Sequence, residues 1–252
     1  MALLEIDDLT VRFGGVVALA NVSFEVGEKE FVSIIGPNGA GKTTLFNVIA
    51  GVVSATSGAV RFKGRPIRGR GPARMSHIGV RRTFQVARPF TSMTVAENIR
   101  MSLPSRHTLY SWRALKLRER DGQYATRVDE LLELTGLREF ADTKASQLNM
   151  GGLRRLEIAR ALAGNPDVLL LDEPSAGIGT DGIRPLANLI RSVRERGVTI
   201  LLVEHYVGLA LSLCDRVVVL DEGGLIASGK PEAIRQDERV ISAYLGTSMA
   251  TG

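Results

Sequence analysis

The sequence predicts an α/β fold built around a parallel β-sheet. The apolar run at residues 31–35 is followed by a glycine-rich loop and then by a helical pattern. Three further apolar runs, at residues 168–171, 198–203 and 217–220, are separated by helical segments. Strands that alternate with helices in this way are typical of a parallel sheet covered by helices.

Strands of a second kind are expected near the amino terminus. Residues 3–6, 16–19 and 22–26 form short strand-like runs around the turn signal Gly14-Gly15. Residues 57–64 alternate between apolar and polar side chains and are bounded by glycines. We therefore expect a small antiparallel β subdomain beside the parallel sheet.

The middle of the chain is predicted to be helical. Residues 94–142 are rich in charge and in helical apolar spacing, and an amphipathic helix follows Gly151. We interpret residues 1–252 as one domain with three parts. An α/β core with its antiparallel β subdomain covers residues 1–93 and 166–230, a helical subdomain covers residues 94–165, and a helical tail covers residues 231–252.

Composition narrows the possible functions. No apolar run approaches the ~18 residues that a membrane-spanning helix needs, so a role at a membrane has to depend on partners. The single cysteine, Cys214, excludes an internal disulfide and fits a reducing cytosol. Residues 61–82 carry eight Lys or Arg and no Asp or Glu, which fits an anionic ligand and an ordinary solvated face equally well.

The strongest motif directly follows the strand predicted at residues 31–35. It fills the phosphate-loop pattern in full with Gly36, Pro37, Asn38, Gly39, Ala40, Gly41, Lys42, Thr43 and Thr44. The glycines let the backbone curl so that its N–H groups and the next helix N-terminus face phosphates. Lys42 is expected to reach the β- and γ-phosphates, and the Thr43 hydroxyl is expected to hold Mg²⁺. The motif predicts a P-loop NTPase core that binds ATP.

Two further segments carry candidate catalytic groups. Asp172 and Glu173 end the apolar run at 168–171, at the edge where a parallel sheet places its ligands. We expect Asp172 to hold Mg²⁺ through water and Glu173 to polarise the attacking water. His205 follows the apolar run at 198–203, so the same geometry brings it beside Glu173, although a lone histidine is as often an ordinary loop residue.

The ordered set of motifs resembles the nucleotide-binding subunits of ATP-binding cassette (ABC) transporters, over about residues 3–246. The set comprises Phe13 before Gly14-Gly15, the phosphate loop, Arg82-Thr-Phe-Gln85, Leu148-Asn-Met-Gly-Gly152, Leu171-Asp-Glu-Pro174 and Glu204-His205. Four segments resemble the branched-chain amino acid importer branch of the family, namely Phe13-Gly-Gly15, Arg82 to Phe90, Met93-Thr-Val-Ala-Glu-Asn98 and Ala243-Tyr-Leu-Gly246.

The resemblance implies a role for several residues that the motifs alone do not settle. Phe13 is expected to stack on adenine, and His205 to hold the γ-phosphate. Gln85 is expected to contact Mg²⁺ or water and to sense the membrane subunit. Asn149, Gly151 and Gly152 occupy the signature position, which in this family caps the nucleotide bound by the opposite subunit.

For the whole chain, the resemblance implies an ATP-hydrolysing motor subunit of an importer for branched-chain or related amino acids, with ATP and Mg²⁺ as cofactors. The implied partners are membrane permease subunits, a second nucleotide-binding subunit that is either an identical copy or a paralogue, and, indirectly, a periplasmic or extracellular solute-binding protein. No nucleic acid is expected as a partner. The implied location is cytoplasmic, peripheral on the inner face of the cell membrane.

The signature region departs from the family pattern. Asn149 replaces the usual serine, Gly152 replaces the usual Gln or Glu, and Gly179-Thr180 replaces the usual residues of the loop after Pro174. Asn149 can still donate through its amide, but from a different position. We expect a weaker or asymmetric dimer clamp, with the groups for hydrolysis intact.

Three other functions compete with this interpretation. A small-molecule kinase uses the same phosphate loop, but the sequence shows no acceptor site. A soluble clamp on the ribosome or DNA usually has two cassettes or a long coiled-coil insertion, and this chain has neither. A nucleotide-binding partner with little activity is consistent with the altered signature region.

Overall fold

The computed structural model describes residues 2–67, 71–83, 89–104 and 122–249, with only the backbone described for 245–249. The chain forms two compact units. The first contains Met1–Arg82, Asp167–Glu173 and Val193–Gly252, and the second contains Thr83–Pro166 and Pro174–Ser192. The predicted three-part division of the chain stays a prediction.

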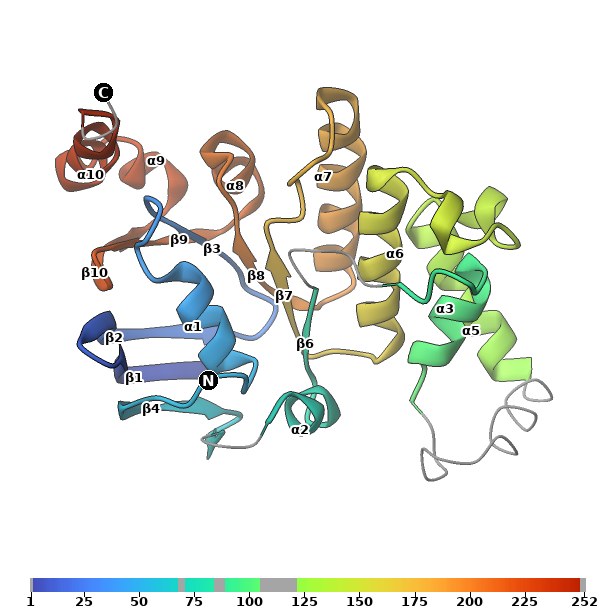
Figure 1. Ribbon diagram of the computed structural model, residues 1–252, viewed down its shortest axis with the longest axis horizontal. Coiled ribbons are helices and arrows are strands. Elements are labelled where there is room, and N and C mark those ends of the chain that lie inside the picture. The colour runs from blue at the N-terminus through green and yellow to red at the C-terminus, as the bar shows by residue number, and fades with distance from the viewer. Residues whose placement is uncertain (1, 68–70, 84–88, 105–121, 250–252) are drawn as a thin grey trace. The chain divides into compact units, whose positions relative to one another are not determined.

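A six-stranded sheet forms the centre of the first unit (Figure 1). Its strands, in spatial order, are β10 (Gly224–Gly229), β9 (Arg216–Asp221), β3 (Phe31–Ile35), β8 (Thr199–Val203), β7 (Val168–Asp172) and β6 (Val80–Arg82). All neighbours are parallel except β10 and β9. Every residue of β3, β7 and β8 is buried, because both faces of a parallel sheet are covered. The predicted fold class is confirmed.

The antiparallel β subdomain also lies in the first unit. It orders β2 (Val16–Gly27), β1 (Ala2–Phe13), β4 (Ser57–Phe62) and β5 (Arg65–Pro66). The two runs predicted at 16–19 and 22–26 form the single strand β2. The register of β2 against β1 shifts between them, where Asn21 takes a left-handed φ of 49°. This bulge explains why the apolar alternation is interrupted there.

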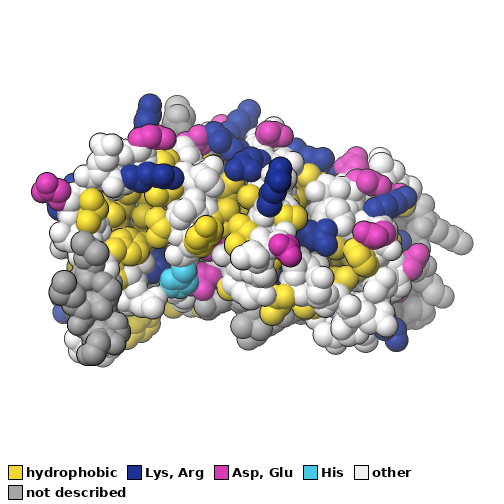
Figure 2. Space-filling model, turned by 90° about the horizontal axis from the view of Figure 1, so that it is seen from above, with side chains coloured by type: hydrophobic (Ala, Val, Ile, Leu, Met, Phe, Trp, Pro, Cys, Tyr) yellow, Lys and Arg dark blue, Asp and Glu magenta, His cyan; other side chains and the backbone are white. Residues whose placement is uncertain are grey.

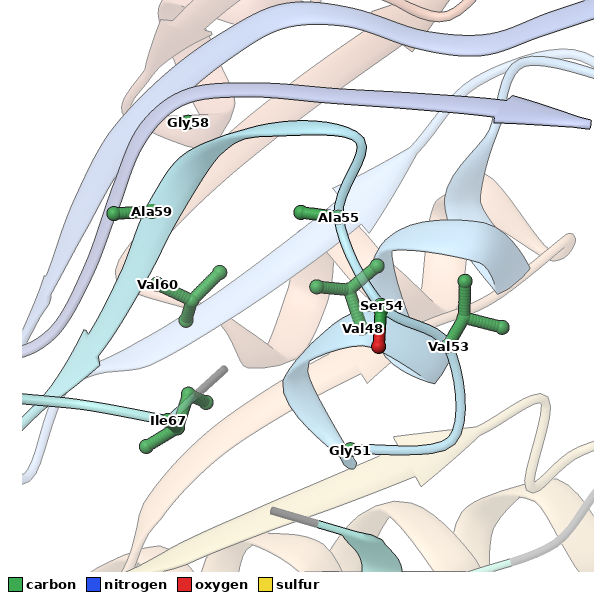
Figure 3. A pocket seen from close by; sticks show the side chains of 9 residues that line it. All are labelled: Val48, Gly51, Val53, Ser54, Ala55, Gly58, Ala59, Val60 and Ile67. Carbon is green, nitrogen blue, oxygen red and sulfur yellow. The ribbon is translucent and has the colours of Figure 1, made fainter. Parts of the chain in front are cut away.

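Helix α1 (Lys42–Ile49) packs between the two sheets (Figure 1). Its side chains Leu45, Phe46 and Ile49 are fully buried in one core with residues of both sheets. Beside α1, apolar side chains that include Val48 and Val60 line a cavity of about 20 Å³ (Figure 3). A cavity of that size holds about one water molecule, so it is a packing gap rather than a ligand site.

Four further helices lie among the described residues of the first unit. They are α2 (Gly71–His77), α8 (Val207–Leu213), α9 (Pro231–Ile234) and α10 (Glu238–Met249). Residues of α8, α9 and α10 share a second buried cluster with Ile35 and Val219. The closing helices expected near residues 232–245 are therefore present as α9 and α10.

The second unit is helical. It contains α3 (Val95–Ser102), α5 (Gly122–Leu134), the 3₁₀ turns Arg138–Phe140 and Ala145–Gln147, α6 (Met150–Ala163) and most of α7 (Thr180–Glu195). Thr94 caps α3 in a capping box with Glu97. Apolar side chains of α3, α5 and α6, such as Ile99, Leu131 and Leu156, are fully buried. Among the described helices of the whole chain, none has the length and apolarity required to span a bilayer.

The basic stretch at residues 61–82 is partly neutralised by carboxylates of the same unit. Arg61 lies 3.4 Å from Asp7, and Lys63 lies 2.8 Å from Asp167. Basic and acidic side chains are likewise interspersed on the face of the molecule shown in Figure 2. These pairs favour the ordinary solvated face over a dedicated anionic ligand.

Candidate nucleotide-binding site

The phosphate loop connects β3 to α1, as the sequence predicts. Gly36 has a φ of 154°, and a β-carbon there would overlap the carbonyl oxygen of Leu220. Gly41 has a φ of 95°, and its β-carbon would lie 2.6 Å from the carbonyl oxygen of Ala18. Only glycine fits both the left-handed backbone and the close approach. The loop is therefore held in place by strands on both sides of it.

Lys42 is buried at the start of α1. Its ammonium donates to the carbonyl oxygens of Gly36 and Pro37, each at 2.7 Å. Burial lowers the pKa of Lys42, and the nearby Glu173 carboxylate acts in the opposite direction. The loop thus holds a desolvated positive charge beside the first N–H groups of a helix, which is an arrangement suited to phosphates.

The loop borders an open cavity of about 210 Å³. Its lining residues are Ala18, Asn38, Gly39, Ala40, Gly41, Lys42, Thr43, Thr44, Glu173 and His205. Glu173 after β7 and His205 after β8 therefore meet the loop that follows β3, as expected for the carboxyl edge of such a sheet. The structure brings these side chains together, while the role of each stays a prediction.

Glu173 and His205 form a pair at the cavity. The Nε2 atom of His205 lies 2.8 Å from Oε1 of Glu173, and their side chains are 52% and 10% exposed, respectively. Glu173 takes a left-handed φ of 46°, which is uncommon for a residue other than glycine. Its N–H donates to the carbonyl oxygen of Val203 on β8 at 2.9 Å, which holds this conformation. Strained backbone of this kind is frequent at functional sites.

Asp172 lies beside the cavity and is not one of its lining residues. Its carboxylate is buried, and its Oδ2 atom lies 2.6 Å from Nη2 of Arg82. Arg82 also donates to Oδ1 of Asn47 on α1, at 2.6 Å. Sequence analysis named Arg82 only as part of a family motif and did not name Asn47, because no spacing rule brings β6, α1 and β7 together.

The roles predicted for Phe13 and Gln85 stay predictions. Phe13 lies at the end of β1, is 51% exposed and is not a lining residue. Its stacking on adenine stays a prediction. Gln85 lies outside the described residues.

The carboxy-terminal helix α10 also reaches the loop. The Tyr244 hydroxyl is hydrogen-bonded to the backbone of Gly36, and burial raises the pKa of this hydroxyl. Tyr244 packs against the apolar cluster under α8 and α9. Sequence analysis gave Tyr244 no role beyond the resemblance.

The signature segment lies in the second unit, at the start of α6. The side-chain oxygen of Asn149 accepts a hydrogen bond from the N–H of Gly152 at 2.8 Å, so Asn149 is the N-cap. Donation through the Asn149 amide, expected from the sequence, stays a prediction, because this contact uses only the side-chain oxygen. A β-carbon on Gly152 would lie 3.2 Å from that of Leu148, so this position has little room for the usual Gln or Glu.

Comparison with known proteins decides the family. The sequence model of the family described as "ABC transporter" matches residues 19–176, which include the phosphate loop and Glu173. The chain belongs to the ABC transporter family. A second model, described as "Branched-chain amino acid ATP-binding cassette transporter", matches residues 225–250, which cover most of β10, α9 and α10.

Individual relatives of this ABC protein match along nearly its whole length. The high-affinity branched-chain amino acid transport ATP-binding protein BraF of Pseudomonas aeruginosa is 42% identical and is aligned over 97% of this chain and 98% of its own. An ATP-binding cassette of an ABC transporter, solved in its ADP conformation, has a TM-score of 0.85 and 31% identity over 98% of this chain and 99% of its own.

A third similar protein was solved as a dimer. It is an ATP-binding cassette in a post-hydrolysis state bound to ADP and Pi, with a TM-score of 0.73 and 26% identity over 90% of this chain and 98% of its own. The chain described here is an ATPase with a nucleotide-binding cassette. This argues against the competing interpretation as a small-molecule kinase.

Proposed function

We propose that this chain is the ATP-hydrolysing motor subunit of an ABC importer for branched-chain or related amino acids. The observation that carries the proposal is the cavity in which the phosphate loop meets the Glu173–His205 pair. The substrate class is supported by the name of the Pseudomonas aeruginosa relative and by the second family match at residues 225–250.

The residues at the cavity fit a magnesium-bound nucleotide. Thr43 and Asp172 offer a hydroxyl and a carboxylate, which are the oxygen ligands that Mg²⁺ prefers. Among the described residues there is no cluster of three or more His, Cys, Asp or Glu side chains, so most ligands would come from phosphates and water. When bound, Mg²⁺ would neutralise charge on the β- and γ-phosphates.

Hydrolysis rests on the residues that line the cavity. Lys42 and the N–H groups at the start of α1 hold the phosphates, and Glu173 accepts a proton from the attacking water. His205, whose Nε2 atom lies 2.8 Å from Oε1 of Glu173, holds the γ-phosphate. Phe13 and Gln85 keep the roles implied by the resemblance, on adenine and on Mg²⁺ or its water.

Transport by this chain requires a second cassette and membrane partners. Asn149, Gly151 and Gly152 at the start of α6 cap the nucleotide of an identical or paralogous subunit, with α6 directing its N-terminal dipole at the γ-phosphate. Closure on ATP and opening after hydrolysis drive permease subunits, because ATP and ADP bind the two states unequally. The chain accordingly acts on the cytoplasmic face of the membrane, and a solute-binding protein delivers the amino acid on the other side.

Uptake measurements test this function. Cells that lack the chain are complemented with the wild-type protein, with Lys42→Ala or with Arg61→Gln, whose ion pairs with Glu5 and Asp7 lie on the surface. Radiolabelled leucine uptake is expected to need the wild-type protein or Arg61→Gln, and to fail with Lys42→Ala. Uptake of leucine, isoleucine and valine that is the same in all strains contradicts the proposed substrate class. Capture of the wild-type protein from membranes identifies the permease.

A further inference from the structure

A buried polar cluster connects three elements of the first unit behind the nucleotide cavity. Arg82 on β6 lies at its centre, with one Nη atom 2.6 Å from Asp172 at the end of β7 and the other 2.6 Å from Asn47 on α1. The side chains of Arg82 and Asp172 are 12% and 2% exposed. The guanidinium carbon also lies 5.9 Å from the centre of the Phe46 ring on α1.

This pair is not explained by stability alone. Taking both charges out of water carries a desolvation penalty that can exceed their attraction, so a buried pair is weak evidence for stabilisation. Within the part of the chain that the structure describes, the Nε atom of Arg82 is buried and has no hydrogen-bond partner, which adds a further cost. The burial of Arg82 at this cost is better explained by its role in holding neighbouring side chains in position.

The fork geometry shows what Arg82 holds. A guanidinium is planar and presents its donors at fixed angles, so binding Asn47 and Asp172 together fixes the position of the Asp172 Oδ2 atom relative to α1. Helix α1 begins at Lys42, next to Thr43, so Asn47 belongs to the same rigid element as the phosphate loop. Arg82 thereby sets the position of this carboxylate oxygen relative to the loop.

We propose that Arg82 is a positioning residue that orients the Asp172 carboxylate toward the magnesium ion of bound ATP, using Asn47 on α1 as its fixed point. This inference rests on the proposed nucleotide site. Groups that orient metal ligands in this way act on metal affinity, and their loss typically weakens it about 10- to 100-fold. A residue that merely competed with the metal for Asp172 would have the opposite effect.

The test separates the magnesium contribution from nucleotide binding itself. The affinity of the full chain for a fluorescent, non-hydrolysable ATP analogue (mant-AMPPNP) is measured in EDTA and in saturating Mg²⁺. The dissociation constant in EDTA divided by the dissociation constant in Mg²⁺ is then compared between variants. Arg82→Gln is expected to lower this ratio about tenfold while leaving the affinity in EDTA unchanged. Arg82→Lys, which keeps the charge and loses the fork, is expected to lower it to an intermediate degree.

Two more variants complete the design. Asn47→Ala removes the anchor and keeps the Arg82–Asp172 pair, so a smaller decrease in the ratio is expected. Arg61→Gln removes an exposed arginine paired with Glu5 and Asp7, and no change is expected. Circular dichroism checks folding, and Asn47→Ala decides the question if the Arg82 variants do not fold.

The outcomes distinguish the inference from the proposed function. A ratio that is unchanged or raised in the folded variants overturns the positioning role of Arg82. A wild-type protein whose affinity for the analogue does not depend on Mg²⁺ overturns the proposed nucleotide site instead.

Discussion

The phosphate loop in the first unit and the signature segment in the second are both glycine-rich turns that precede a helix, but they differ in how firmly they are built. In the phosphate loop, Gly36 and Gly41 lie very close to the backbone of neighbouring strands. Lys42 is buried and donates two hydrogen bonds to loop carbonyl groups. In the signature segment, the backbone N–H of Gly152 donates to the side-chain oxygen of Asn149, which caps α6.

The difference separates two tasks. Groups for binding and hydrolysis are fixed by the fold of one unit, so their geometry exists before any partner arrives, which favours catalysis. In the proposed function the signature segment acts on the nucleotide of another subunit, so we expect its fit to be completed only on dimerisation. We therefore expect changes in the first unit to affect chemistry and nucleotide affinity, and changes at α6 to affect association.

The largest effect is expected for His205→Ala. Loss of a donor aimed at the γ-phosphate is expected to lower kcat about 10²- to 10³-fold. ATP affinity in EDTA should change little, because Lys42 and the loop remain. Steady-state ATP hydrolysis and analogue binding measure the two effects. A variant with wild-type kcat contradicts the assignment of His205.

The next largest effect is expected for Lys42→Ala. Removal of charge-assisted hydrogen bonds worth about 1.5–3 kcal/mol predicts an ATP affinity about 10- to 100-fold weaker. Fluorescence titration with mant-AMPPNP measures it. Lys63→Ala, which removes an exposed lysine paired with Asp167, is the matched control. Equal mant-AMPPNP affinities in the two variants would contradict the special role of the phosphate loop within the first unit.

The smallest effects are expected at Asn149. Asn149→Ala removes the N-cap of α6 and is expected to lower the free energy of unfolding by about 1 kcal/mol, whereas Asn149→Ser keeps a capping oxygen and should lower it far less. Denaturant unfolding measures this difference. Asn149→Ser also restores the usual family residue, so we expect ATP-dependent dimerisation in light scattering to strengthen. Weaker dimerisation in that variant would show that asparagine is the better residue here.

Contiguous motifs were the easiest part to predict. The phosphate loop was evident because one stretch supplies the strand, the glycines, the lysine and the helix. The meeting of Glu173 with His205 was predicted from the common edge of parallel strands. In both cases regular sheet geometry carries the information from sequence to site.

Long-range polar contacts were not predictable in the same way. Strand β6 was missed because Val80-Arg-Arg82 has a single apolar side chain, and without that strand Arg82 cannot be placed beside Asp172. The left-handed backbone of Glu173 and the capping of Gly152 by Asn149 also depend on local geometry that residue types do not specify.

The most direct test of the central claim compares the wild-type protein with Glu173→Gln in the same assay. Because the amide cannot accept a proton from water, ATP turnover is expected to fall at least about 100-fold. Magnesium-dependent affinity for mant-AMPPNP should be retained, since Lys42, Thr43 and Asp172 are unchanged. Glu28→Gln, at an exposed site, should behave as the wild type. Undiminished turnover in Glu173→Gln would contradict the catalytic role on which the proposed motor function depends.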